Sequence, residues 1–156
     1  MSDKSSCKCR ICQGACRRKP GWYKPGEIEK SAELLGLTTK EFFDQYVMVD
    51  YWLSDEENKE PVFVLSPAFA GSGGGMAPFD PKGACSLFKD GNCRIHGAKP
   101  FECSEYIHTR TMEEVGVAHK SCMEAWRDHQ GQIEELLGRK PAVPDISFAD
   151  MLSILS

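Results

Sequence analysis

Eight cysteines are the residues of this chain whose type and spacing best suit chemistry. Four are crowded near the N-terminus and four are spread over a later segment: Cys7, Cys9, Cys12, Cys16, Cys85, Cys93, Cys103 and Cys122. Cysteines as close in sequence as the first four rarely reach disulfide geometry. The chain begins without the apolar stretch of a signal peptide and has no apolar run long enough to span a membrane. We therefore expect a soluble, cytoplasmic protein whose thiols bind metal; disulfides in an exported protein are the alternative.

The spacing of the first four cysteines predicts metal binding. Cys9-x2-Cys12 lets two sulfurs converge on one ion from a tight turn, and four thiolates complete the tetrahedral shell of zinc. Iron–sulfur clusters are also held by four thiolates, so zinc and iron are alternative cofactors. The eight cysteines fit two four-cysteine sites or one polynuclear site with shared sulfurs. The close Cys7-x-Cys9 pair is unusual for a single zinc, which keeps the polynuclear site open. We expect all eight cysteines to be metal ligands.

Histidines are the other residues that could bind the metal. Imidazole suits both zinc and iron, and His96 lies three residues after Cys93, which makes it the first candidate for an additional ligand. His108 and His119 lie in the same segment or just after it, and they too could be ligands or hydrogen-bond partners of ligands. An exposed or hydrogen-bonded side chain is the alternative for each. No Ser/His/Asp arrangement with diagnostic spacing is present, so no catalytic residue is identified and enzymatic activity is left open.

Charge is distributed unevenly along the chain. The net charge is −4, yet residues 1–24 carry seven basic residues against one acid, a net of +6. Basic residues that alternate with cysteines can offset the negative charge of thiolates around a cation, which is the interpretation we favour. The alternative is a basic patch that binds nucleic acid. Metal ions are thus the expected partners, a protein or a nucleic acid is a further candidate, and a membrane is not expected.

Several elements that could position these residues are predicted in the first half of the chain. Residues 1–25 are expected to form a Cys-rich loop that cannot build a core of its own. Apolar spacing indicates a helix over residues 27–35, and Thr38-Thr39-Lys40-Glu41 is a capping box that opens a second short helix. Residues 47–53 and 61–66 are rich in β-branched and aromatic side chains and predict an antiparallel strand pair.

A glycine-rich segment over residues 71–75 follows the second predicted strand. Such a loop can bind phosphate only when a helix N-terminus follows it, and here two prolines follow instead. We therefore expect a mobile surface loop.

The C-terminal part of the chain is predicted to hold the longest helix. Ser121 and Glu124 form a further capping-box match, so the helix should run over residues 121–138 with Cys122 in its first turn. A helix N-terminus lowers the pKa of a thiol, which suits a metal-bound thiolate. The alternative is that Cys122 is a small buried residue in line with Trp126. The tail over residues 139–156 could add a last short helix.

Two segments resemble the YkgJ-like "CxxCxxCC" family. One is Cys9-Arg-Ile-Cys12-Gln-Gly-Ala-Cys16-Arg, and the other is the series Gly83-Ala-Cys85-Ser-Leu-Phe88, Gly91-Asn-Cys93-Arg-Ile95-His96 and Lys99-Pro100-Phe-Glu-Cys103. Cys122 matches a cysteine that some members place before a C-terminal helix, so the resemblance covers residues 7–138. It implies a zinc- or iron-chelating domain, often described as an iron–sulfur protein. One relative, flagellin lysine methylase, carries the domain within an enzyme.

The chain departs from this family's pattern at two places. Cys12-x3-Cys16 stands where the family has Cys-x2-Cys-Cys, so the adjacent pair is missing and Cys7 is the candidate replacement. Lys99 stands where arginine is commoner, and lysine cannot make the bidentate anion contact that arginine makes. The ligand set of the family is therefore not carried over unchanged.

Together these patterns predict one small α+β domain over residues 1–156, built of short helices and a β-hairpin organised around a cysteine-ligated metal centre. The metal would connect the N-terminal cysteines to those of residues 85–122 and so replace part of a larger core. The predicted function is metal binding by a cysteine cluster. The alternatives are an iron–sulfur enzyme, in electron transfer or protein modification, and a zinc module that binds nucleic acid or the ribosome through the basic N-terminus.

Overall fold

The computed structural model describes the central part of the chain. The described residues are 21–53, 60–69, 73–77, 84–89, 92–98, 100–105 and 111–143. The predicted tail helix lies outside them, as do the side chain of His96 and five residues named above as candidate ligands: Cys7, Cys9, Cys12, Cys16 and His108.

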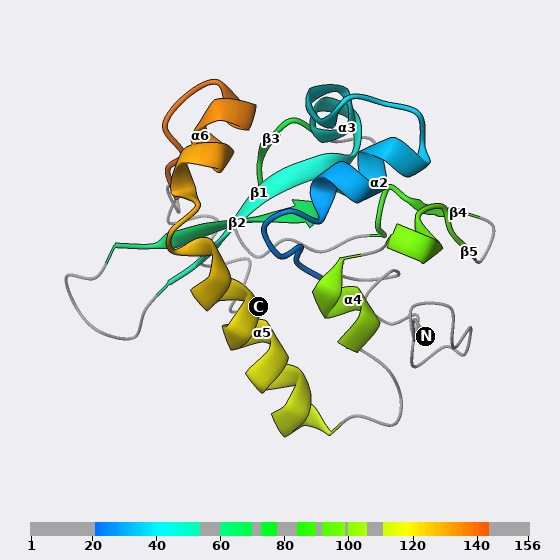
Figure 1. The fold of residues 1–156 in the computed structure, drawn as a ribbon. Coiled ribbons are helices and arrows are strands. Elements are labelled where there is room, and N and C mark those ends of the chain that lie inside the picture. Colours follow the sequence, from blue (N-terminus) through cyan, green and yellow to red (C-terminus); the bar gives the residue numbers. More distant parts are fainter. Residues whose placement is uncertain are drawn as a thin grey trace, which may run out of the picture.

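Within residues 21–46, two short helices precede the sheet: α2 (Ile28–Leu34) and α3 (Thr39–Tyr46) (Figure 1). Both confirm the predicted helices. The capping box at the start of α3 is also confirmed, because the Thr38 hydroxyl accepts from the Glu41 amide (3.1 Å) and the Glu41 carboxylate accepts from the Thr38 amide (3.0 Å). These bonds satisfy amides that have no partner within the helix.

A three-stranded mixed sheet forms the centre of the fold. Strands β1 (Val47–Trp52) and β2 (Val62–Pro67) pair antiparallel, with Val47 opposite Pro67 and Trp52 opposite Val62, which confirms the predicted strand pair. The short β3 (Gly75–Met76) pairs parallel to β1 on its other side, so the strand order is β2-β1-β3.

The glycine-rich segment belongs partly to this sheet. Residues 75–76 form β3, and the Gly74 amide donates to the Val47 carbonyl (2.7 Å). A Cβ atom on Gly73 would lie 2.5 Å from the Gln45 carbonyl oxygen, so a larger residue would not fit there. The expected loop over residues 71–75 is therefore wrong at Gly75, which belongs to β3, whereas residues 71–72 lie outside the described part of the chain. The absence of a side chain at Gly73 allows the backbone to approach the end of α3 closely.

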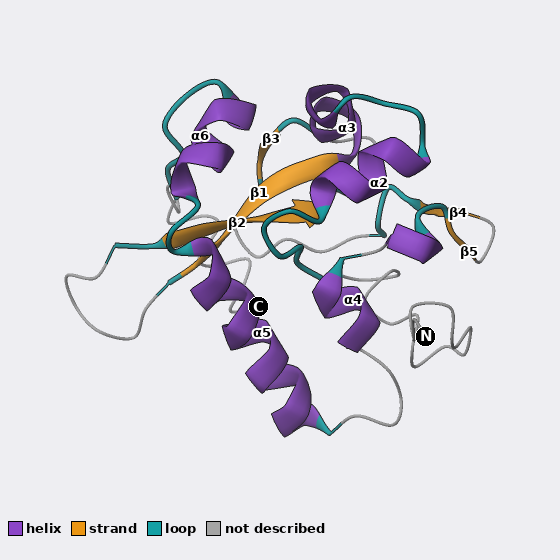
Figure 2. Ribbon diagram, viewed as in Figure 1, coloured by secondary structure: helices purple, strands orange, loops and turns teal. Residues whose placement is uncertain are grey.

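The second cysteine segment folds into small elements beside the sheet. They are the two-stranded β4 (Phe88–Lys89) and β5 (Asn92–Cys93), a 3-10 turn over His96–Ala98, and α4 (Phe101–Glu105). Figure 2 distinguishes these helices and strands by colour.

The C-terminal region contains two helices, α5 (Met112–Trp126) and α6 (Gln130–Leu137), in place of the single predicted helix over residues 121–138. The true start of α5 is a capping box formed by Thr111 and Glu114. The match at Ser121 lies inside α5, so the predicted helix start there is wrong. The same residue pattern also occurs in the interior of helices. The helices separate where the Gln130 side chain donates to the Trp126 carbonyl (2.8 Å).

The core lies between the sheet and the helices. Helices α5 and α6 contact β2, α3 contacts β1, and α4 contacts α5. The largest fully buried side chains include Trp126, Tyr23, Phe42 and Phe43. The described residues thus form a small α+β fold, as predicted. None of the helices in this described part of the chain has the length and apolar character that a membrane span needs.

The capping box of α3 gives a first prediction. Thr38→Ala should lower the free energy of unfolding by about 1 kcal/mol, because it removes the side-chain acceptor of the Glu41 amide. Urea denaturation would measure the change. Thr39→Ala is the matched control, since Thr39 is the first residue inside the helix. Equal losses in the two variants would contradict the capping role.

Candidate metal centre

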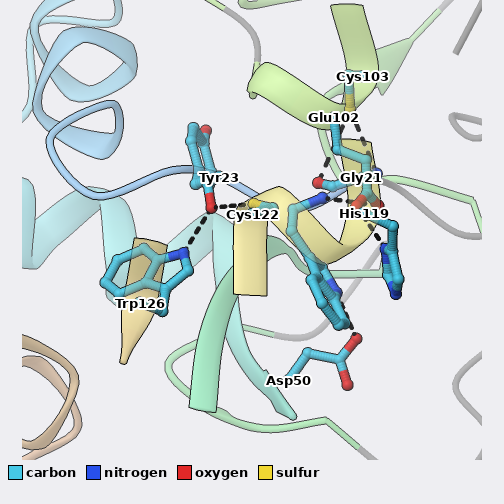
Figure 3. Close-up of polar contacts among 9 residues, drawn as sticks. Gly21, Tyr23, Asp50, Glu102, Cys103, His119, Cys122 and Trp126 are labelled. Atoms are coloured by element: carbon cyan, nitrogen blue, oxygen red, sulfur yellow. Dashed lines mark hydrogen bonds and ion pairs between the residues drawn. The ribbon is translucent and has the colours of Figure 1, made fainter. Parts of the chain in front are cut away.

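Residues 21–24 follow the N-terminal cysteines in sequence and contribute to the core. Figure 3 shows Gly21 of this segment beside Cys103 and Tyr23 beside Cys122 and Trp126. Trp22 and Tyr23 are 2% and 0% exposed. The Tyr23 amide donates to the Leu65 carbonyl of β2 (2.9 Å), and the Trp22 carbonyl accepts from the Glu102 amide of α4 (3.2 Å). Both side chains belong to the main hydrophobic core, so the end of the expected loop over residues 1–25 packs into the same core as the sheet and the helices.

Cys103 on α4 lies against the start of this segment. Its sulfur accepts from the Gly21 amide at 3.3 Å and lies 3.8 Å from the Gly21 carbonyl oxygen. A Cβ on Gly21 would lie 2.8 Å from the Cys103 nitrogen and 2.9 Å from the Glu102 Cβ, so only glycine permits this approach. Gly21, five residues after Cys16 in sequence, therefore lies beside a cysteine of the second segment.

Cys85 and Cys93 lie in and beside the small β4–β5 pair. Cys85 is buried and forms an isolated bridge with Phe69, and its sulfur accepts from the Leu87 amide, two residues on, at 3.5 Å. Cys93 lies opposite Phe88 and is half-buried. Backbone amides that donate to sulfur stabilise the thiolate form, which is the form that binds metal.

Three thiols act electrostatically on one buried phenol. Burial raises the pKa of Tyr23 well above its ordinary value of 10.0, the hydrogen bond with Ser31 opposes this shift, and Cys103, Cys85 and Cys93 raise the pKa further. Cys85, Cys93 and Cys103, which are separated by as many as 18 residues in sequence, thus all contribute to the electrostatic environment of Tyr23.

The described residues do not complete a metal site by themselves. Within residues 21–143, gaps excepted, no three side chains of His, Cys, Asp or Glu lie close enough together to hold an ion. The donors that are present nevertheless suit a thiophilic metal, since Cys85 and Cys103 are thiols whose sulfurs accept backbone N–H bonds. Any centre here would need further donors from the undescribed part of the chain.

Cys122 occupies a different environment from the one predicted. It lies in the interior of α5, not in a first helical turn, and it is 0% exposed. Its thiol donates to the Tyr23 carbonyl at 2.9 Å. Burial raises the pKa of Cys122 well above its ordinary value, Glu102 and Glu27 raise it further, and Lys24 opposes them. The expected lowering of this pKa is wrong, and the geometry agrees with the alternative of a small buried residue in line with Trp126.

A polar network beside Cys103 was not predicted as a unit. The Glu102 carboxylate accepts from the Trp22 amide (3.3 Å) and lies 2.5 Å from His119 Nδ1. The Trp22 indole stacks on His119 with ring centroids 3.9 Å apart, and its N–H donates to the buried Asp50 carboxylate (2.9 Å). His119 was a candidate from its position near the second cysteine segment, but no sequence spacing connects it to Glu102 or Asp50.

Comparison of the chain with known proteins gives no match to a family model, to a curated protein or to a solved structure. The resemblance of the cysteine segments to the YkgJ-like family therefore stays a hypothesis.

The raised pKa of Cys122 gives a second prediction. Above its ordinary pKa of 9.0 the thiol ionises in the unfolded chain but stays protonated in the folded one. The free energy of unfolding should therefore fall as pH rises beyond about 9, by up to about 1.4 kcal/mol per pH unit. Urea denaturation from pH 8 to 10 would measure this slope in the wild type and in Cys122→Ala.

The variant should show a flatter pH dependence than the wild type. Tyr23 contributes little in this window, because its unfolded-state pKa is about 10. Parallel curves would contradict the prediction, because they would mean that the pKa of Cys122 is the same in the folded and the unfolded chain. A wild-type curve that rises with pH relative to the variant would show a thiolate in the folded protein, as a metal ligand would be.

Proposed function

We propose that the protein binds zinc or an iron–sulfur cluster through Cys85, Cys93 and Cys103 together with cysteines of the N-terminal segment. The observation that carries the proposal is that the sulfur of Cys103 accepts from the amide of Gly21 at 3.3 Å, so a cysteine of the second segment lies against a residue only five positions after Cys16. A metal bound by Cys103 and by cysteines of the N-terminal segment would give this contact a physical reason, because the cation would neutralise the thiolates that it gathers.

Chain connectivity supports a contribution from the N-terminal cysteines. Gly21 lies against the sulfur of Cys103, and Cys16 precedes Gly21 by five residues. At about 3.5 Å per residue, the Cα of Cys16 can be no more than about 18 Å from that of Gly21. Cys16 and its neighbours are therefore within reach of Cys103. The predicted site also includes Cys7, Cys9 and Cys12, with His96 as a further candidate ligand.

A bound metal would give the fold a cross-link that its small elements lack. Strands β4 and β5 have two residues each, and α4 has five, so each contributes little stability alone. Ligands on these elements and in the N-terminal segment would make metal binding part of the folding free energy. The seven basic residues among the first 24 would offset thiolate charge at the same place.

An iron–sulfur enzyme is the second candidate function, favoured by the His119–Glu102 pair on the α4–α5 side of Cys103. A carboxylate-oriented imidazole is a common arrangement for proton transfer. A zinc module for nucleic acid, the third candidate, rests on the basic N-terminus alone.

Metal content is the direct prediction. Protein purified without oxygen should carry at least one zinc or iron per chain, measured by elemental analysis. Visible absorption and acid-labile sulfide would identify an iron–sulfur cluster. Cys103→Ser should lose most of the metal, whereas the control Cys122→Ala should keep it. Metal-free wild-type protein that stays folded and unchanged on metal addition would refute the proposal.

Hydrogen exchange gives an independent prediction. Removing the metal with a chelator should weaken the N–H···S bonds to Cys103 and Cys85, so the Gly21 and Leu87 amides should exchange faster. The amides shared by β1 and β2 are the internal control, because their ladder does not involve the cysteines. Unchanged exchange at both Gly21 and Leu87 would show that these sulfurs are not metal ligands.

A further inference from the structure

Strand β2 lies at an edge of the three-stranded sheet, because the strand order is β2-β1-β3. Alternate residues of an antiparallel strand direct their backbone groups away from the paired neighbour. On β2 these residues include Phe63 and Leu65, since both form backbone hydrogen bonds with residues outside the sheet. Open backbone groups on an edge strand are a template for pairing with another chain, so the partners of these two residues decide whether β2 can add a strand.

The side chain of Gln130, the first residue of α6, takes the place of a neighbouring strand at Phe63. Its oxygen Oε1 accepts from the Phe63 amide (3.0 Å), and its Nε2 donates to the Phe63 carbonyl (2.9 Å). A residue opposite Phe63 on an added antiparallel strand would make the same two bonds with its own backbone. Nε2 also donates to the Trp126 carbonyl (2.8 Å), which holds the carboxamide in this position.

Two further features cover the same edge. The Tyr23 amide donates to the Leu65 carbonyl (2.9 Å), and Pro61, directly before β2, has no N–H to offer to another strand. Both of these covers belong to the backbone. The carboxamide of Gln130 belongs to a side chain, so it can leave the edge without a change in the path of the chain.

The sequence of β2 gives this cover a physical reason. Residues 62–65 read Val-Phe-Val-Leu, which are uncharged residues suited to strands. Segments of this composition pair readily with copies of themselves when their edge is open. Many edge strands carry a lysine or another charge against such pairing, and β2 carries none over Val62–Pro67.

A cleft of about 520 Å³ lies along this part of the edge. Its lining includes Pro61, Val62 and Phe63 on the strand, and Gln130 and Glu134 on α6. An extended segment that enters the cleft therefore reaches the backbone of Phe63 once the Gln130 carboxamide has left it.

We propose that Gln130 is a guard residue, one that prevents β2 from pairing with the β2 strand of a second copy of this chain. The pairing would be antiparallel about a two-fold axis, with Phe63 of one copy opposite Phe63 of the other. Each copy would then supply the N–H and the C=O that the carboxamide supplies within a single chain. A second copy is the fitting occupant because it brings the same uncharged segment to the other side of the pair. This inference does not depend on metal binding.

Sedimentation velocity of Gln130→Ala tests the proposal. The variant loses both bonds to Phe63 and should form a dimer whose fraction rises with protein concentration, whereas the wild type should stay a monomer. Gln132→Ala is the matched control, because Gln132 lies on the same helix and its Nε2 donates to Glu29 (2.9 Å) rather than to β2. Thr38→Ala controls for lost stability, because its capping bond belongs to α3. Both controls should stay monomeric.

Hydrogen exchange locates the contact between the copies. In Gln130→Ala the Phe63 amide should exchange several-fold more slowly at a concentration where the dimer predominates than at one where the monomer does. Gln130→Met keeps the length of the side chain without its hydrogen bonds, and it repeats the test if the alanine variant does not fold. A folded variant that stays monomeric, association that leaves the Phe63 amide unprotected, or equal association of the wild type or of Thr38→Ala would overturn the proposal.

Discussion

The carbonyl oxygen of Tyr23 accepts two buried hydrogen bonds from α5, one from the Cys122 thiol (2.9 Å) and one from the Trp126 indole (2.6 Å). The amide of the same residue pairs with β2, and its hydroxyl donates to Ser31 of α2. One residue thus connects the sheet, the first helix and the longest helix. Each of these groups would cost about 1–3 kcal/mol if it were buried without a partner, so the path of residues 21–24 is strongly fixed.

That fixed path determines what lies near the cysteines. Because Gly21 and Trp22 run beside α4, consecutive residues of that helix face them, Cys103 toward Gly21 and Glu102 toward Trp22. The candidate metal centre and the candidate acid–base pair therefore share α4. A change that moves α4 should alter both the candidate metal centre and the His119–Glu102 pair, whereas Glu102→Gln should alter only the pair.

Local patterns predicted some of the elements but not the contacts between them. The capping box at Thr38 and the β-branched residues after Tyr46 predicted α3 and the strand pair, because their causes lie within a few residues. The prediction of a helix start at Ser121 was wrong, because a capping pattern does not distinguish the start of a helix from its interior. The Glu102–His119 pair and the burial of Cys122 depend on how α4, α5 and residues 21–24 pack. The spacing of residues along the sequence does not predict this packing.

The central claim is that the cysteines bind metal as thiolates. X-ray absorption spectroscopy at the edge of the bound metal, on protein purified without oxygen, tests it most directly because it measures the ligand shell itself. The account predicts a shell dominated by sulfur at about 2.3 Å from the metal. A shell made only of nitrogen and oxygen at about 2.0–2.2 Å, unchanged in Cys103→Ser, would contradict it.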